Sequence, residues 1–458
     1  MLNSEIIREL KRAVGAKNLV TDIAERFAYA YDSQPEKGLP DAVAHVESAT
    51  GIVAVLRIAV KYGIPVVARG AGSGMTGGSV PESGGIVLNM ERMNRILRID
   101  VEDRIGWCQP GVITSDFQKA AERLGLFYPP EPASAQFSSL GGNVAESAGG
   151  LTTVKYGLTK HYVAGLEFVT AAGTIVRTGV YTDRQSPFDV GSLVAGSEGT
   201  LGIVTEIALR LIPLPRVKRT ILAFFRTIVD TVRASNAVRA SGAEPSVLEF
   251  MDRSCIDTVR EYAGVAIPEG TGALLLVELD GAEEDLADAD RVVMDTLARM
   301  NPVELKNAAG DREREALWTL RKSTSPAIAR IAPLKYNEDI CVPISQIPLI
   351  CEFVEELGRR RVVRVVSFGH SGDGNLHINF MTSPERPEEL GRVKEAIGEL
   401  FRETVRLGGT LSGEHGIGMM KRPYLGIALD GPTIAFEKAV KRALDPENIL
   451  NPGKIFPE

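Results

Sequence analysis

The sequence predicts an α+β protein with two domains and a C-terminal segment that returns to the interface between them. Residues 40–215 are rich in glycine and contain short β-like runs separated by turns. After the break at Pro213-Leu-Pro215, strand and helix patterns alternate regularly, and a second Gly-rich loop follows at 408–418. A length of 458 residues suits two or three domains, with expected ranges of 1–217, 218–408 and 409–458.

The first domain is expected to combine short strands with one amphipathic helix. Apolar residues in 51–62 recur at three- and four-residue intervals, which predicts a helix there. The expected strands are Ile64–Ala68, Gly85–Leu88, Leu166–Thr170 and Gly202–Leu211.

The second domain is expected to be an antiparallel sheet covered by helices. Its predicted strands are Arg219–Phe225, Val247–Phe250 and Gly272–Leu279, and its predicted helices are Val229–Ala240, Ser254–Tyr262 and Glu283–Met300. A strand–turn–strand unit at 362–380 and a closing helix from Pro432 to Leu444 complete the chain.

Composition excludes several classes of protein. Fifty-two basic and 59 acidic residues give a formal charge of −7, so no basic surplus exists for a nucleic-acid partner. Apolar runs such as Ile52–Leu56 fall far short of the ~20 residues that span a bilayer, which predicts no transmembrane segment. The first 20 residues lack the apolar core of a signal peptide. We expect a cytoplasmic protein, with any membrane association peripheral and through a partner.

Cysteine and histidine usage narrows the chemistry. The four cysteines are widely spaced and form no C-x-x-C pair, so an iron–sulfur cluster within the chain is not expected. Of five histidines, three fall in two short C-terminal motifs, namely His370, His377 and His415.

A glycine loop follows the first predicted strands, in the segment Arg69-Gly-Ala-Gly-Ser-Gly-Met-Thr-Gly-Gly-Ser79. Gly72, Gly74 and Gly77 match the dinucleotide fingerprint, which requires a helix directly afterwards. Pro81, two further glycines and a strand pattern follow instead, so a nicotinamide cofactor is rejected. Closely spaced glycines still allow backbone N–H groups to converge on an anion, the alternative being a strained surface turn.

Four further Gly/Ser-rich segments suit a long, flat ligand lying along many backbones. They are Pro129–Ser134 with Ser138–Gly142, Glu146–Gly150, Lys155–Gly157 and Gly196–Ile203. In this order and spacing, residues 40–215 resemble the FAD-binding domain of the vanillyl-alcohol oxidase and p-cresol methylhydroxylase type.

The resemblance implies a set of FAD-binding residues. Arg69, Gly70, Ala71, Gly72, Ser73, Gly74 and Gly77 would hold the pyrophosphate, while Gly141, Gly142, Gly149, Gly150 and Ile203 would approach the rest of the cofactor. Pro130, Ser134, Gly157 and Asn451 complete the expected set. His161 and Cys108 lie in no motif typical of a covalent tether, so non-covalent FAD is expected.

The histidine motifs predict a metal site. In Gly369-His-Ser-Gly-Asp-Gly-Asn-Leu-His377 a tight turn would bring His370 and His377 together, and Ser412-Gly-Glu-His-Gly-Ile-Gly418 leaves Glu414 and His415 accessible. Two histidines and one carboxylate commonly hold a catalytic divalent metal. The alternative is that hydrogen bonds satisfy the imidazoles. The helical H-E-x-x-H of zinc peptidases is missing, which weakens a metal-dependent hydrolase as the competing function.

These motifs, with Asp445-Pro-Glu-Asn-Ile-Leu-Asn-Pro-Gly-Lys454, resemble FAD-linked D-2-hydroxyacid dehydrogenases, a family that includes D-lactate dehydrogenase, the glycolate oxidase flavoprotein subunit and D-2-hydroxyglutarate dehydrogenase. The resemblance implies that His370, His377 and Glu414 hold one divalent metal, zinc being favoured and iron or manganese the alternatives. It implies that His415 is the base. Arg321 and Lys335 are expected to bind the substrate carboxylate, and Asn379 to hydrogen-bond the substrate.

The expected reaction is oxidation of a D-2-hydroxy acid to the 2-oxo acid, with hydride transfer to flavin N5. D-Lactate or glycolate is favoured as the substrate, and D-2-hydroxyglutarate is the alternative. Electrons would pass to an electron-transfer flavoprotein, an iron–sulfur subunit or a quinone. A homodimer is compatible with the sequence, and a non-catalytic flavin-binding subunit is a third interpretation. The interpretation as an enzyme requires the two imidazoles, the carboxylate and the flavin to border one cavity.

Overall fold

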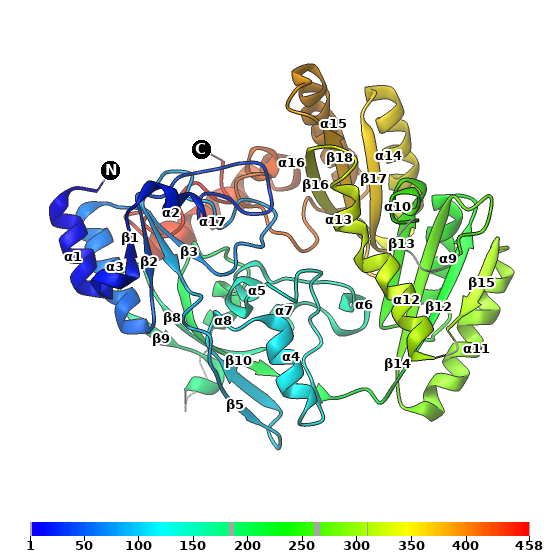
Figure 1. Cartoon of the computed structure of the whole chain (residues 1–458), viewed down its shortest axis with the longest axis horizontal. Helices are drawn as coiled ribbons and strands as arrows, with labels where there is room; N and C mark the ends of the chain where they lie inside the picture. The colour runs from blue at the N-terminus through cyan, green and yellow to red at the C-terminus, as the bar shows by residue number, and fades with distance from the viewer. Residues whose placement is uncertain (1, 183–186, 261–265, 309, 458) are drawn as a thin grey trace. The chain divides into compact units, whose positions relative to one another are not determined.

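The computed structural model describes residues 2–182, 187–260, 266–308 and 310–457. The chain forms two compact units (Figure 1). The first unit comprises Met1–Ala148, Leu158–Leu214 and Glu414–Glu458, and the second comprises Gly149–Gly157 and Pro215–Gly413. The three sequence domains expected above remain predictions.

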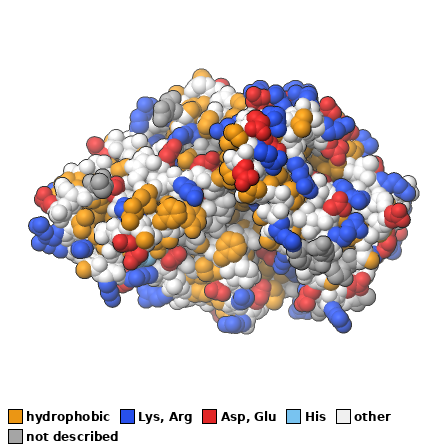
Figure 2. All heavy atoms as spheres, turned by 45° about the horizontal axis from the view of Figure 1, so that its top comes forward, with side chains coloured by type: hydrophobic (Ala, Val, Ile, Leu, Met, Phe, Trp, Pro, Cys, Tyr) orange, Lys and Arg blue, Asp and Glu red, His pale blue; other side chains and the backbone are white. Residues whose placement is uncertain are grey.

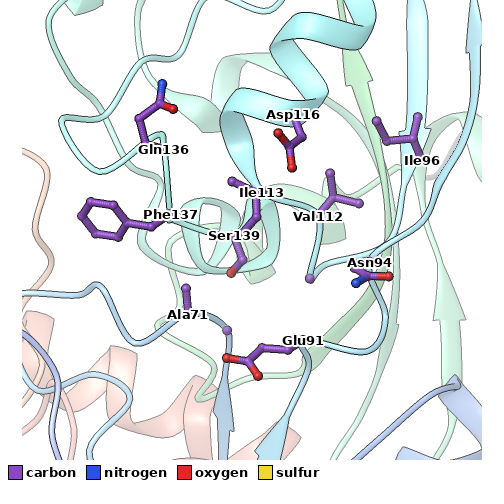
Figure 3. A pocket seen from close by; sticks show the side chains of 12 residues that line it. Ala71, Glu91, Asn94, Ile96, Val112, Ile113, Asp116, Gln136, Phe137 and Ser139 are labelled. Atoms are coloured by element: carbon purple, nitrogen blue, oxygen red, sulfur yellow. The ribbon is translucent and has the colours of Figure 1, made fainter.

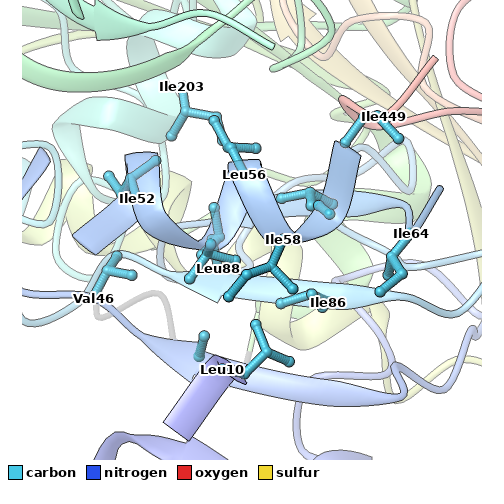
Figure 4. Packing of buried hydrophobic residues seen from close by; sticks show 14 of the residues in the cluster. Leu10, Val46, Ile52, Leu56, Ile58, Ile64, Ile86, Leu88, Ile203 and Ile449 are labelled. Carbon is cyan, nitrogen blue, oxygen red and sulfur yellow. The ribbon is translucent and has the colours of Figure 1, made fainter. Parts of the chain in front are cut away.

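The first unit opens with a four-stranded sheet in the order β1-β2-β4-β3. Its strands are β1 (Leu19–Val20), β2 (Ala42–His45), β3 (Val66–Arg69) and β4 (Ile86–Asn89), and its helices are α1 (Ser4–Val14), α2 (Ile23–Phe27) and α3 (Ala49–Tyr62). Helix α3 begins at the Ser48 cap, whose Oγ accepts from Gly51 N–H, and ends at Gly63, whose φ is +62°. Its apolar face packs on the sheet, with Leu56 and Leu88 fully buried (Figure 4).

A second, antiparallel sheet in this unit has the order β5-β6-β10-β8-β9. Its strands are β5 (Ile96–Asp100), β6 (Ile105–Cys108), β8 (Val163–Val169), β9 (Ile175–Arg177) and β10 (Ile203–Arg210). The connections contain α4 (Thr114–Glu122), α5 (Leu140–Glu146), α7 (Thr159–Tyr162), α8 (Val190–Val194) and the short pair β7 (Leu126–Phe127) with β11 (Ile212–Pro213).

The C-terminal segment extends the first sheet. After α16 (Leu425–Ala428) and α17 (Gly431–Leu444), Val66 N–H donates to Ile449 O and Asn451 N–H donates to Val66 O, both at 2.8 Å. Leu450 thus pairs in parallel with Val66, the first residue of β3. Residues more than 380 positions apart therefore build the strand edge from which the glycine loop departs.

The second unit is built on a seven-stranded antiparallel sheet in the order β15-β12-β14-β13-β17-β18-β16. The strands are β12 (Val217–Phe225), β13 (Val247–Asp252), β14 (Ala273–Gly281), β15 (Glu304–Asn307), β16 (Leu334–Cys341), β17 (Arg364–His370) and β18 (Asn375–Thr382). The helices are α6 (Thr153–Tyr156), α9 (Ile228–Ala240), α10 (Arg253–Val259), α11 (Glu283–Arg299), α12 (Asp311–Lys322), α13 (Thr324–Ile328), α14 (Ile347–Arg361) and α15 (Pro387–Arg406).

Apolar cores cover both faces of this sheet. Alternate residues of β12, β13 and β14 pack against α9 and α11 on one face and against α10, α12 and α13 on the other. The second of these faces also carries Phe368 of β17 and Met381 of β18. Because side chains alternate along a strand, His370 of β17 and His377 of β18 lie on this same face.

The α+β fold class predicted from the sequence is confirmed, as is the strand at 86–89 that excludes a helix after the glycine loop. The helix expected at 254–262 is α10, although Tyr262 lies outside the described residues. Among the helices that the structure describes, none is both long and apolar enough to cross a bilayer. Basic and acidic side chains are interspersed over the face shown in Figure 2.

Candidate active site

The glycine loop, residues 69–79, begins where β3 ends in the first unit. Arg69 is buried and donates from Nη1 to Ser79 Oγ at 3.2 Å, so its side chain connects the two ends of the loop. Gly72 and Gly77 have φ values of +66° and +77°, a conformation that favours glycine. Gly77 N–H donates to the carboxylate of Asp32 at 2.8 Å, which fixes the loop in shape. Burial raises the pKa of this Asp32 carboxyl to about 6.

A cavity of about 430 Å³ lies beside this loop (Figure 3). Its size falls within the range typical of small-molecule sites. It is lined by Gly70, Ala71, Glu91, Asn94, Ile96, Gly111, Val112, Ile113, Asp116, Gln136, Phe137 and Ser139.

Two glycines, Gly70 in the glycine loop and Gly141 in α5, are closely packed against neighbouring residues. A Cβ atom on Gly70 would lie 2.0 Å from Ser139 Oγ, and one on Gly141 would lie 2.4 Å from Pro110 Cβ. Ser139 caps α5 by accepting from Gly142 N–H. Two separate Gly-rich motifs therefore expose backbone around one cavity, which fits a cofactor that binds along backbone groups.

The remaining residues expected to bind FAD are distributed over both units. Asn451 Nδ2 donates to Gly78 O at 2.8 Å and to Glu198 O at 2.7 Å, which places Asn451 against the glycine loop. Ile203 is part of the apolar core beside α3. Pro130 is buried and Ser134 half-buried in the connection before α5, whereas Gly149, Gly150 and Gly157 belong to the second unit.

The hairpin of β17 and β18 brings His370 and His377 together, as the sequence predicts. The register pairs Phe368 with His377 and His370 with Asn375. Both imidazoles are buried, their rings are perpendicular, and their Nε2 atoms lie 3.3 Å apart. Two ring nitrogens of one hairpin thus converge on a single point.

Glu249 of β13 braces the first of these histidines. The strand register places it opposite His370, and one carboxylate oxygen contacts His370 Nδ1. The other oxygen accepts from Arg321 Nε at 2.7 Å. A carboxylate can only accept hydrogen bonds, so Nδ1 of a neutral His370 carries the proton and Nε2 presents its lone pair toward His377.

The spacing of the two Nε2 atoms fits a tetrahedral metal. Zinc–nitrogen bonds of about 2.0–2.1 Å at tetrahedral angles separate two ligand nitrogens by about 3.3–3.4 Å, and the observed separation is 3.3 Å. One ligand atom from each of His370, His377 and Glu414 lies within 4.8 Å of the other two.

Asp339 anchors the backbone that precedes Glu414. It lies opposite His377 in the β16–β18 register, and its carboxylate accepts from Gly413 N–H at 2.9 Å and from Ser412 Oγ at 3.2 Å. Glu414 is joined to Gly413 by one peptide bond, so the chain delivers this carboxylate directly after an anchored residue.

Of the two cationic residues expected to bind the substrate carboxylate, Arg321 is buried and Lys335 is half-buried. Arg321 stacks over the Phe368 ring, with its guanidinium carbon 4.7 Å from the ring centroid. Lys335 Nζ lies 3.5 Å from Ser325 Oγ, and burial lowers the pKa of this lysine. Both residues belong to the second unit, as do His370 and His377.

Asn379 and His415 are held by their surroundings in different ways. Asn379 Oδ1 accepts from Asn337 Nδ2 at 2.6 Å, while its Nδ2 donates to Val366 O and His377 O. Its amide therefore braces the hairpin. The carbonyl of His415 accepts from Thr76 Oγ1 at 3.2 Å, which ties this residue to the glycine loop of the first unit.

Sequence reasoning missed Glu249, Asp339 and Asp32. Glu249 stands alone in the apolar strand Val-Leu-Glu-Phe-Met, and a charged residue in such a run must find a partner if it is buried. Asp339 lies four residues after Lys335, at an alternate position that shares a strand face with it. No sequence pattern around Asp32 indicates that its carboxylate accepts a hydrogen bond from Gly77 of the glycine loop.

Comparison with known proteins adds the family. Residues 40–179 match the model described as an FAD binding domain, and residues 214–455 match FAD linked oxidases, C-terminal domain. The chain is 39% identical over 458 residues to the glycolate oxidase subunit GlcD of Bacillus subtilis (strain 168), covering 100% of this chain and 97% of the relative.

Two further relatives carry related names. The D-lactate dehydrogenase of Anaerostipes hadrus is 33% identical, with 98% of this chain and 97% of the relative covered. The D-2-hydroxyglutarate dehydrogenase of Stutzerimonas stutzeri (strain A1501) is 30% identical, with both chains covered completely (100%). The fold is similar to that of p-cresol methylhydroxylase, with a TM-score of 0.82 over 98% of this chain and 96% of that one at 17% identity.

The FAD-binding match covers the glycine loop and α5, while the C-terminal match covers the hairpin, Arg321 and Glu414. Together with relatives matched along the whole chain, these findings favour an oxidoreductase over the metal-dependent hydrolase. The chain belongs to the FAD-linked oxidases, flavoproteins that share the fold of p-cresol methylhydroxylase.

Proposed function

We propose that this protein oxidises a D-2-hydroxy acid, with D-lactate or glycolate favoured, to the 2-oxo acid, using non-covalent FAD and a divalent metal at His370, His377 and Glu414. The supporting observation is the pair of buried Nε2 atoms 3.3 Å apart in a chain of this family. Zinc is the favoured metal because the separation suits tetrahedral nitrogen ligands, and iron or manganese is the alternative.

When bound, FAD supplies a two-electron acceptor, and the metal supplies a Lewis acid that lowers the pKa of a bound hydroxyl. Oxidation removes the substrate's hydroxyl proton and a hydride from its C2. An imidazole with a pKa near 6.5 is a weak base for an alcohol. A metal lowers the pKa of bound water from about 15.7 to about 7, a change that corresponds to roughly 12 kcal/mol. A smaller lowering of the pKa of the substrate hydroxyl is enough for an imidazole to act as its base.

His415 takes the hydroxyl proton in this proposal, at an imidazole nitrogen. Its backbone is fixed by Thr76 Oγ1 through its own carbonyl and by Glu198, whose carboxylate accepts from Ile417 N–H and Gly418 N–H at 2.7 Å. Three contacts thus hold the loop that carries the imidazole.

Arg321 and Lys335 bind the substrate carboxylate in this proposal. Glu249 accepts from Nε of Arg321, so the terminal Nη groups make the substrate contact. Lys335 adds a second positive charge, which also suits a dicarboxylate such as D-2-hydroxyglutarate, the alternative substrate. Asn379 acts indirectly here, by bracing the hairpin.

Anaerobic mixing with D-lactate or glycolate tests the oxidation. The flavin absorbance is expected to bleach, and His415→Ala is expected to slow the bleaching by about 10²–10⁴-fold, the usual contribution of a general base. His161→Ala is the matched control, since His161 is exposed in the same unit. Bleaching by His415→Ala at the parent rate would remove this residue from the mechanism.

The substrate is identified by comparing kcat/KM for D-lactate, glycolate, D-malate and D-2-hydroxyglutarate. The smaller acids are expected to lead, and a clear preference for D-2-hydroxyglutarate would replace them. Elemental analysis of the purified protein identifies the metal, with one zinc per chain expected.

Reduced flavin is expected to pass its electrons to an electron-transfer flavoprotein, an iron–sulfur subunit or a quinone. The four cysteines are all free thiols, and Cys108, Cys255 and Cys351 are buried, which supports an acceptor outside the chain. Slow turnover with oxygen and fast turnover with an artificial dye are expected. Rapid turnover with oxygen alone would make the protein an oxidase.

A further inference from the structure

We infer that Glu249 is a positioning residue that fixes His370 as a metal ligand through Nε2 and, with its second oxygen, holds Arg321. The inference rests on the metal site proposed above and adds a residue outside the three expected ligands. Its basis is the placement of one buried carboxylate between an imidazole and a guanidinium.

Burying a glutamate at position 249 is unfavourable for folding unless its carboxylate is paired. Its side chain is 0% exposed on a central strand, between β17, which carries His370, and β14. An isolated ionised carboxylate there would be strongly destabilising, and pairing offsets the cost only if both oxygens are satisfied. One oxygen contacts His370 Nδ1 and the other accepts from Arg321 Nε at 2.7 Å, which meets that condition.

The position of Glu249 between Arg321 and His370 determines which ring nitrogen of His370 carries the hydrogen. Arg321 Nε donates to one oxygen of Glu249, and a carboxylate offers no hydrogen to the imidazole at its other oxygen. Nδ1 of His370 must therefore donate, which leaves the Nε2 lone pair pointing at the site shared with His377. Carboxylates that orient metal-binding histidines in this way raise metal affinity by about 10–100-fold.

The Glu249 carboxylate also links the metal ligand His370 to Arg321, the cationic residue that binds the substrate carboxylate. Glu249 lies opposite His370 in the strand register, while Arg321 reaches it from helix α12. Phe368, two residues before His370, packs against both the guanidinium and the His377 ring. The Glu249 side chain thereby positions both the metal ligand His370 and the guanidinium of Arg321 that binds the substrate carboxylate.

Glu249→Gln tests the inference with little change in shape. Its amide oxygen can still accept from Arg321, but its NH₂ group then faces His370 Nδ1. A donor at that position favours the tautomer with hydrogen on Nε2, which cannot bind a metal through Nε2. Glu278→Gln is the matched control, because Glu278 is a buried glutamate of the neighbouring strand that accepts hydrogen bonds from Thr220 Oγ1 and Trp318 Nε1.

Metal affinity is measured on the full-length flavoprotein by competition with a chelator, using Zn²⁺ and, for its visible absorption, Co²⁺. Glu249→Gln is expected to bind about 10–100-fold more weakly than the parent, and Glu278→Gln within twofold of it. Affinity of Glu249→Gln equal to that of the parent would overturn the inference. His377→Ala separates the two proposals: if it too binds like the parent, the metal site itself is wrong.

A second measurement needs no variant at position 249. In the zinc-loaded parent labelled with ¹⁵N-histidine, the His370 resonances, assigned with His370→Ala, are expected to show hydrogen on Nδ1 and metal on Nε2. Metal on Nδ1, or hydrogen on Nε2, would overturn the role given to Glu249. The result stands even if Glu249→Gln fails to fold.

Discussion

Lys441→Met is expected to destabilise the first unit by about 3 kcal/mol. Lys441 is 8% exposed in α17, and its Nζ donates at 2.8 Å to both Thr200 O and Leu450 O while pairing with Asp445, which is 1% exposed. Removing one partner of a buried ion pair costs about 3–5 kcal/mol because the other charge stays buried. Asp445 keeps hydrogen bonds from Ile449 N–H and Leu450 N–H, which places the expected loss at the lower end.

The assay uses the position of the two tryptophans. Trp107 belongs to the first unit and Trp318 to the second, so in a Trp318→Phe background the fluorescence of Trp107 reports urea unfolding of the first unit alone. Lys119→Met is the control: it also removes a helical lysine paired with an aspartate, but the two side chains are 56% and 66% exposed. The control is expected to cost less than about 0.5 kcal/mol. A loss below about 1 kcal/mol for Lys441→Met would refute the argument that this pair secures the C-terminal segment.

Three further predictions concern the cofactor loop and the metal. Gly70→Ala should weaken FAD binding, because the new Cβ would lie 2.0 Å from Ser139 Oγ, and the fluorescence of released flavin measures this. The control is Gly51→Ala in helix α3, where the new Cβ has space, and this variant should bind FAD normally. Asp32, with its pKa raised from 3.8 to about 6, binds its proton more tightly in the folded state. Its contribution to the unfolding free energy should therefore be greatest below pH 4 and fall by about 3 kcal/mol as the pH rises through 6. Urea titrations from pH 4 to 7.5 should show this trend in the parent relative to Asp32→Asn, and a constant difference would contradict it. His377→Ala should lose more metal affinity, by chelator competition, than the 10–100-fold expected for an outer residue, and an unchanged metal content would contradict that.

Much of the fold was accessible from local patterns. The 3.6-residue period identified α3, and the alternation of strand and helix patterns placed α9, α10 and α11 in the second unit. The helices α12 to α15 were not predicted. Gly63 and the Ser48 cap then mark the ends of α3 within two residues of the prediction. The sheet order could not be predicted this way: β13 lies between β14 and β17, which are separated by more than 80 residues, and periodicity carries no information about such neighbours.

In the candidate site, too, local contacts could be predicted from the sequence and long-range contacts could not. The turn between His370 and His377 is local, so the sequence alone predicts that the two imidazoles meet. Glu249 lies 121 positions from His370, and only the strand register brings them together. The guanidinium of Arg321 was expected to meet a substrate carboxylate, yet the chain supplies a carboxylate of its own, which no pattern around residue 321 reveals.

The pairing of Leu450 with Val66 has a consequence for biosynthesis. The ribosome releases the N-terminal strands long before their last partner, so the sheet edge that carries the cofactor loop stays incomplete while residues 215–413 of the second unit are translated. That unit is free to fold during synthesis, since residues 215–413 emerge as one continuous stretch. Flavin loading should consequently be a late, post-translational event, and nascent chains truncated before residue 445 should emerge with a folded antiparallel sheet but little capacity to retain flavin.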